Sequence, residues 1–139
     1  MVAKSDRNTP LTNQIFFSDF LDNFDSHPVN NTLARAINAD AVKQSMRNLV
    51  LTNLGERLFQ PTIGSDVLKS LFEPNDIVTA ENISYYIKNT LKQNEPRVLV
   101  LTVDVTPDTE SSSFNVTIIF SLVNNTTTQS LDIILKRVR

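Results

Sequence analysis

The last third of the chain alternates apolar and polar side chains with the period of a β-strand. Three such runs follow one another, separated by polar stretches at 107–113 and around Asn124-Asn125. Because successive strands with short connections pair as an antiparallel meander, we expect a small sheet with one apolar face. The positions predicted to share that face are Leu99, Leu101, Val103 and Val105, then Phe114, Val116, Ile118, Phe120 and Leu122, and finally Leu131, Ile133 and Leu135.

Three helices are predicted before these strands, over residues 39–52, 65–73 and 79–94, from apolar residues at helical spacing. Asn38 and Thr79 are the predicted caps of the first and third helices, and Pro74 and Pro96 follow the second and third. The expected apolar positions are Val42, Met46 and Leu49 beside Ser45, then Val67, Leu68, Leu71 and Phe72, and then Ala80, Ile83, Tyr86, Ile87 and Leu91. Since the helices precede the strands, the fold class is α+β, with about three helices packed on a small antiparallel sheet formed mainly by the C-terminal strands.

Residues 1–32 form a polar, asparagine-rich leader that contains a cluster of large apolar side chains. The spacing of this cluster suits one face of a short helix, whereas the aspartates and asparagines within it favour turns, so a helix and an extended arm both stay open. Its members are Phe16, Phe17, Phe20, Leu21 and Phe24. They need cover either from this chain's own core or from a neighbouring protein. We treat 1–32 as an N-terminal arm and 33–139 as one domain.

The composition excludes several classes of function. Thirteen basic and fifteen acidic residues among 139 give a net charge of -2, which does not indicate nucleic acid as a partner. The absence of cysteine excludes disulfides and thiolate sites and is compatible with a reducing cytosol. The N-terminus has no apolar signal segment, and no run is long enough to cross a bilayer, so we expect no membrane association.

Candidate chemistry is sparse. His27 is the one histidine and stands in the polar leader, so neither a catalytic triad nor a histidine metal site is expected. Nucleotide-binding glycine patterns are missing as well, and we expect no cofactor and no small-molecule substrate. Both glycines, Gly55 and Gly64, fall in the segment 52–65, which predicts a loop with unusual φ values there.

The motif Glu95-Pro96-Arg97 lies at the predicted junction of helix and strand. Glu95 could be the general acid of a glycosidase, with Asp104 or Asp108 as its partner. However, an arginine two residues away lowers a carboxyl pKa, which is the wrong direction for an acid at neutral pH. The structural alternative is that Glu95 and Arg97 form specific hydrogen-bonded pairs, within the domain or across an interface.

Three motifs in consistent order over about residues 33–138 resemble one known family. They are Leu51-Thr52-x-x-Gly55-Glu56-Arg57-x-Phe59-x-Pro61-x-x-Gly64, then Leu71-Phe72-Glu73-Pro74, and then Glu95-Pro96-Arg97 opening a strand. The chain is similar to the baseplate wedge family of contractile-tailed phages, typified by the phage gene 25 product. Relatives of that family include the phage W protein and a type VI secretion baseplate subunit.

The resemblance implies a structural part of a virion tail baseplate, assembled in the host cytoplasm, although the family is often labelled lysozyme-like. The implied partners are other wedge subunits and the tail sheath protein. Glu95, Pro96 and Arg97 would then be a contact element. The segment with Gly55, Glu56, Arg57, Pro61 and Gly64 would be a structural loop.

The resemblance also implies that the last strand docks the sheath by main-chain pairing. Its residues are Leu131, Ile133, Ile134, Leu135, Lys136 and Arg137, and Arg139 completes a basic cluster at the end. Without the family, a basic tail that keeps a sheet edge soluble is the simpler interpretation. The competing function for the whole chain is a peptidoglycan-hydrolysing muramidase with Glu95 as its acid.

Overall fold

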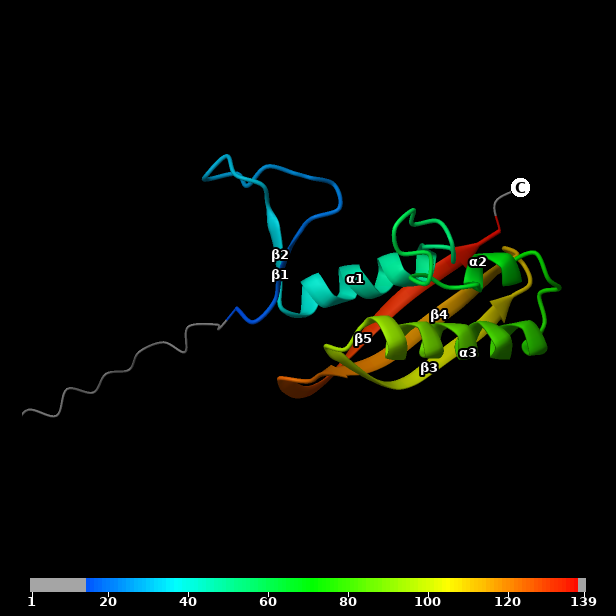
Figure 1. The fold of residues 1–139 in the computed structure, drawn as a ribbon. Coiled ribbons are helices and arrows are strands. Elements are labelled where there is room, and N and C mark those ends of the chain that lie inside the picture. Colours follow the sequence, from blue (N-terminus) through cyan, green and yellow to red (C-terminus); the bar gives the residue numbers. More distant parts are fainter. Residues whose placement is uncertain (1–14, 138–139) are drawn as a thin grey trace, which may run out of the picture. The chain divides into compact units, whose positions relative to one another are not determined.

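A computed structural model describes residues 15–137, and these fall into two compact units that divide between Ala41 and Val42 (Figure 1). The first contains strands β1 (Ser18–Phe20) and β2 (Arg35–Ile37). The second contains most of helix α1 (Ala39–Leu51), helices α2 (Val67–Ser70) and α3 (Ile77–Asn94), and strands β3 (Val98–Asp108), β4 (Ser113–Leu122) and β5 (Asn125–Lys136).

The first unit is an extended hairpin. β1 and β2 pair antiparallel, with Asp19 opposite Ala36, and the Asn38 side-chain oxygen accepts hydrogen bonds from the backbone N–H groups of Phe16 and Phe17. The extended arm is therefore confirmed over the described part of the leader, and the helix alternative is wrong there. Residues 1–14 of the predicted arm lie outside the described residues, and the predicted boundary after residue 32 stays a prediction.

The helices of the second unit lie close to their predicted positions. α1 ends one residue earlier than predicted, whereas α2 is much shorter than the predicted 65–73. Because α2 ends at Ser70, Phe72 lies in the following turn and its ring is exposed, so its predicted place in the core is wrong. The guanidinium of Arg137 lies over that ring, 5.6 Å from its centroid.

α3 begins two residues before the predicted cap. The Asp76 side chain accepts a hydrogen bond from the Thr79 N–H, so Asp76 is the N-cap and Thr79 is the third helical residue. The hydrogen bond from the Thr79 backbone also lowers the pKa of Asp76 below its ordinary value. The helix ends at Asn94, immediately before Glu95-Pro96, as a proline at this place predicts.

The predicted meander is confirmed: β3, β4 and β5 pair antiparallel in the order β3-β4-β5. All inward positions predicted for β4 and β5 are buried. In β3 the prediction is wrong for Leu99 and Leu101, which are 60% and 45% exposed. A β-bulge between Val100 and Thr102 shifts the alternation by one residue, so Val98 and Val100 share a face with Val103 and Val105.

The core lies between the apolar face of this sheet and the three helices, which lie on one side of it (Figure 1). Val42, Met46, Val67, Ile83, Ile87 and Leu91 are fully buried from the helical side, and Val116, Ile118, Phe120 and Leu135 from the sheet. None of the helices among residues 15–137 has both the length and the apolar character needed to cross a bilayer.

Candidate functional site

The Glu95-Pro96-Arg97 motif lies where α3 turns into β3, and its carboxylate is buried. Arg97 donates from Nε to Glu95 Oε1 at 2.6 Å and from Nη2 to Oε2 at 2.7 Å, which is a two-point contact. The Ser45 hydroxyl of α1 donates to Oε2 at 2.6 Å. The Glu95 side chain is 3% exposed, against 32% for Arg97. This Ser45–Glu95–Arg97 cluster therefore joins α1 to the junction of α3 and β3.

The cluster keeps Glu95 ionised. Burial by itself would raise the pKa of Glu95, but the hydrogen bonds from Arg97 and Ser45 and the charge of Arg97 together outweigh burial and lower it. Of the two structural alternatives, a pair within the domain is what the structure shows. A contact with another protein stays a prediction.

The same geometry argues against a glycosidase. A general acid must hold its proton near neutral pH, which the lowered pKa of Glu95 opposes. Asp104 is exposed and lies six residues along β3 from Val98, or roughly 20 Å at strand spacing, and Asp108 lies farther still. Catalytic carboxyl pairs are about 5–10 Å apart. Asp108 is also engaged by the Ser111 hydroxyl at 2.6 Å.

Both glycines of the loop have positive φ, +85° at Gly55 and +137° at Gly64, as predicted. The Gly55 N–H donates to the Pro61 carbonyl at 2.9 Å, and the Glu56 carboxylate accepts from the Asn53 N–H at 2.9 Å. At the base of the loop, Thr90 Oγ1 of α3 donates to the Gly64 carbonyl at 3.2 Å. The loop is therefore held by its own backbone and by α3.

The tip of this loop carries two apolar side chains whose exposure the sequence analysis did not predict: Leu58, and Phe59 of the first family motif. Leu58 is 90% exposed and Phe59 is 96% exposed, and the neighbouring Arg57 is exposed as well. The loop backbone places them outside the core although they are apolar. Hydrophobicity alone therefore could not identify them as surface residues, but their place between two glycines in a loop could.

Buried and exposed side chains alternate along the end of the predicted docking strand, β5. Leu131, Ile133 and Leu135 belong to the core, whereas Ile134, Lys136 and Arg137 are exposed. Arg139 lies outside the described residues.

The hydrogen-bond alternation gives the direction of the β5 backbone groups. The Val123 N–H donates to the Arg97 carbonyl, and the Val103 carbonyl accepts from the Ser84 hydroxyl of α3. The backbone groups of Val103 therefore point away from β4. Those of Ile118, which pairs with Val103 from β4, point toward β5. Because Ile118 lies opposite Leu131, the backbone N–H of Ile134 points outward from the open edge of β5.

The one histidine and the acidic side chains provide no further candidate site among the described residues. His27 is exposed in the first unit, where its Nδ1 accepts from the Val29 N–H at 3.3 Å. Among residues 15–137 no group of histidine, aspartate or glutamate side chains could hold a metal ion.

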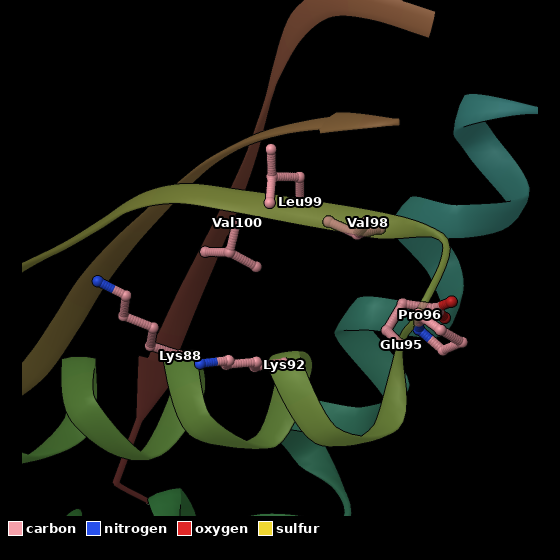
Figure 2. A pocket seen from close by; sticks show the side chains of 7 residues that line it. All are labelled: Lys88, Lys92, Glu95, Pro96, Val98, Leu99 and Val100. Atoms are coloured by element: carbon pink, nitrogen blue, oxygen red, sulfur yellow. The ribbon is translucent and has the colours of Figure 1, made fainter. Parts of the chain in front are cut away.

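One groove was not predicted. It has a volume of about 380 Å³ and lies between α3 and the start of β3, next to the motif (Figure 2). Lys88, Lys92, Glu95, Pro96, Val98, Leu99 and Val100 line it. The sequence signal for it, two lysines four residues apart on a helix, is too common to identify a groove.

The two glycines should differ sharply in their tolerance of a side chain. A Cβ at Gly64 would lie 2.7 Å from the Thr52 carbonyl oxygen and 2.8 Å from that of Asn53, whereas a Cβ at Gly55 meets no atom within 4 Å. We expect Gly64→Ala to lower the free energy of unfolding by more than about 2 kcal/mol, and Gly55→Ala by about 1 kcal/mol, from backbone strain alone. Urea denaturation measures both, and equal losses would contradict the described loop geometry.

The Ser45–Glu95–Arg97 cluster should make stability depend on pH. The folded-state pKa of Glu95 is lowered from 4.5, so its contribution is present above that pH and is lost as pH falls through the folded value. We expect Glu95→Gln to lower the free energy of unfolding by about 2 kcal/mol near neutral pH.

The difference between the Glu95→Gln variant and the unchanged chain should shrink as the pH falls below 4.5 and through the lowered folded-state pKa of Glu95, because the unchanged chain then loses the same charge. Denaturation curves at several pH values measure this difference. A difference that stays constant with pH would show that Glu95 is not held ionised.

Comparison with known proteins gives a consistent result. Residues 37–127 match the model of the family described as baseplate wedge protein gp25. The baseplate wedge protein gp25 of Enterobacteria phage T4 is 30% identical over 96 residues, which cover 69% of this chain and 73% of that protein.

Solved structures share the fold. A Geobacter sulfurreducens protein provisionally described as a tail lysozyme matches with a TM-score of 0.59 and 24% identity over 70% of this chain and 91% of its own. A chain of the anti-feeding prophage baseplate matches with a TM-score of 0.60 and 20% identity over 88% of each chain. A chain of the type VI secretion baseplate complex matches with a TM-score of 0.52 and 19% identity over 68% of this chain and 89% of its own. With three motifs in order, a confirmed α+β fold and a family match over most of its length, the chain belongs to the baseplate wedge protein gp25 family.

Proposed function

We propose that this chain is a non-catalytic structural subunit of a contractile-tail baseplate, which assembles with other wedge subunits and provides a strand-pairing edge on which the tail sheath begins. The observation that carries the proposal is that β5 is an edge strand, whose outer side pairs with no other strand of residues 15–137. Exposed strand edges are templates for the strands of other chains, and proteins that do not use them usually cover or blunt them.

Several features of β5 suit pairing with a partner strand. The Ile134 N–H points outward, and its side chain is exposed on the same strand. Lys136 and Arg137 add positive charge at the end of the edge, which would orient an approaching partner. The strand itself is firmly fixed, because Ile133 and Leu135 on either side of Ile134 are buried in the core.

The Glu95-Pro96-Arg97 motif supplies the proposed contact with other wedge subunits. Its carboxylate is used within the domain, so the surface it offers consists of the exposed Pro96 and the partly exposed Arg97 side chain. The cluster holds that surface rigid, which lowers the conformational entropy lost on binding.

Hydrolysis is not part of the proposal. The Glu95 pKa is lowered and no second carboxylate lies at a catalytic distance along β3, so the family's lysozyme-like label finds no support in this site. Peptidoglycan hydrolysis by the purified chain that disappears in a folded Glu95→Gln variant would overturn this conclusion.

Sheath docking is tested by removing one outward donor. Ile134→Pro deletes the N–H at the open edge, where proline is tolerated, so the domain should stay folded while sheath fails to polymerise on assembled baseplates. The matched control is Ile134→Ser, which removes the apolar side chain but keeps the N–H and should still support sheath. Electron microscopy measures sheath length. Full-length sheaths on baseplates that carry folded Ile134→Pro would place docking elsewhere.

Wedge assembly is tested with two variants that weaken the same cluster from opposite sides. Arg97→Lys removes the two-point contact and alters the exposed surface, whereas Ser45→Ala removes one buried hydrogen bond and leaves the surface unchanged. At matched stability, we expect only Arg97→Lys to reduce co-purification with wedge partners, by about tenfold. Equal behaviour of the two variants would reduce the motif to a folding element.

A further inference from the structure

The groove beside the motif contains a second open strand edge. It lies between α3 and the first residues of β3, and β3 is the strand at the opposite side of the sheet from β5. Figure 2 shows Val100 directed from β3 toward α3, Leu99 directed to the other side, and Lys88 projecting from α3 toward the strand. The groove is therefore bordered by a helix, a strand edge and an exposed leucine.

Main-chain groups of β3 point into this groove. The Arg97 carbonyl accepts a hydrogen bond from the Val123 N–H, so the Arg97 carbonyl points toward β4. Because backbone groups alternate in direction along a strand, those of Val98 and Val100 point away from β4. The Val98 N–H is used by the Glu95 carbonyl at 3.3 Å. By the same alternation the Val98 carbonyl and the N–H and carbonyl of Val100 point away from β4, and among residues 15–137 these groups make no backbone hydrogen bond outside the sheet.

The open stretch has defined ends. On one side is the turn at Pro96. On the other, the bulge at Leu101 interrupts the strand, and beyond it Ser84 Oγ of α3 donates to the Val103 carbonyl at 2.9 Å. After the bulge, α3 therefore reaches the edge of β3 through a side-chain hydrogen bond, whereas before the bulge no side chain of α3 is hydrogen-bonded to β3 among the described residues.

Two lysines of α3 line the groove beside this stretch of β3. Lys88 and Lys92 are four residues apart on α3, both are exposed, and neither has a carboxylate partner among residues 15–137. Two like charges at this spacing repel each other, so an anionic partner between or beside them would be stabilised.

We infer that this groove binds an extended acidic segment of a neighbouring protein, which adds a short strand to the edge of β3 at Val98–Val100. The spacing of charges supports a strand: Lys88 and Lys92 are separated by about 6 Å along the helix axis. Side chains two residues apart on a strand are separated by about 6.8 Å. A segment with two carboxylates two residues apart can therefore meet both lysines while its backbone pairs with Val100.

The inference goes beyond the proposed function, because it assigns a partner chemistry to the edge opposite the sheath-docking strand. It is tested on the purified full chain without baseplates, so its failure and a failure of sheath docking through Ile134 are separate results.

The probe is a short synthetic peptide that alternates glutamate and valine. We expect it to shift the NMR signals of Val98, Leu99 and Val100 and to slow hydrogen exchange of the Val100 N–H, while the Ile134 N–H is unchanged. A peptide of the same length that alternates lysine and valine should not bind. An acidic peptide with methylated backbone nitrogens should bind more weakly, because it cannot donate to the Val98 and Val100 carbonyls.

The variant test reverses the two charges. Lys88→Glu combined with Lys92→Glu should weaken binding of the acidic peptide about tenfold or more, and raised salt should weaken binding to the unchanged chain. The matched control is Lys136→Glu combined with Arg137→Glu, which changes the net charge equally on β5 and should leave binding unchanged. The inference is overturned by no binding at millimolar peptide, by equal binding to the double lysine variant, or by signal shifts confined to β5.

Discussion

The buried carboxylate of Glu95 is the interaction on which the rest of this domain depends. It lies at the turn from α3 into β3 and accepts hydrogen bonds from Arg97 on the strand and from Ser45 on α1, so one side chain connects three elements. A buried carboxylate without these donors would be strongly destabilising, because burial penalises its charge. The sequence Glu-Pro-Arg provides the arrangement locally: the proline ends the helix and the arginine two residues on returns to the carboxylate.

This connection also determines what the surface of the domain presents. The turn at Pro96 starts β3 beside the last turns of α3, which brings the strand edge at Val98–Val100 next to two lysines of the helix. Farther along, the bulge interrupts the strand and the Ser84 hydroxyl occupies the Val103 carbonyl. The stretch between the turn and the bulge is short, and a stretch of this length suits a short extended segment rather than a whole sheet.

Local patterns predicted the elements of the fold, and non-local contacts explain where prediction failed. The alternation in β4 and β5 identified every buried apolar position, because the β4–β5 register is regular from Ser113 to Ser121 and shifts only at the end of β4. The same pattern misplaced Leu99 and Leu101, since a bulge in β3 leaves the alternation of apolar residues unchanged while it reverses the face. Ser45 could not be assigned to Glu95 at all, because fifty positions separate them and only packing of α1 brings them together. The groove at Lys88 and Lys92 escaped prediction for the same reason.

The two edges of the sheet differ in chemistry, and that difference has a consequence for assembly. The β5 edge carries an exposed isoleucine and is followed by an arginine after its terminal lysine, whereas the start of the β3 edge has two lysines beside it from a helix. Backbone pairing by itself does not distinguish one strand from another, so a subunit with two equal edges would polymerise through them or exchange its partners. A pair of lysines spaced for carboxylates two residues apart gives the β3 edge a charge requirement that the β5 edge does not share, because β5 has only its terminal cations. The net charge of -2 leaves this positive patch as a local feature against a slightly negative background, which favours binding of an acidic segment at this edge.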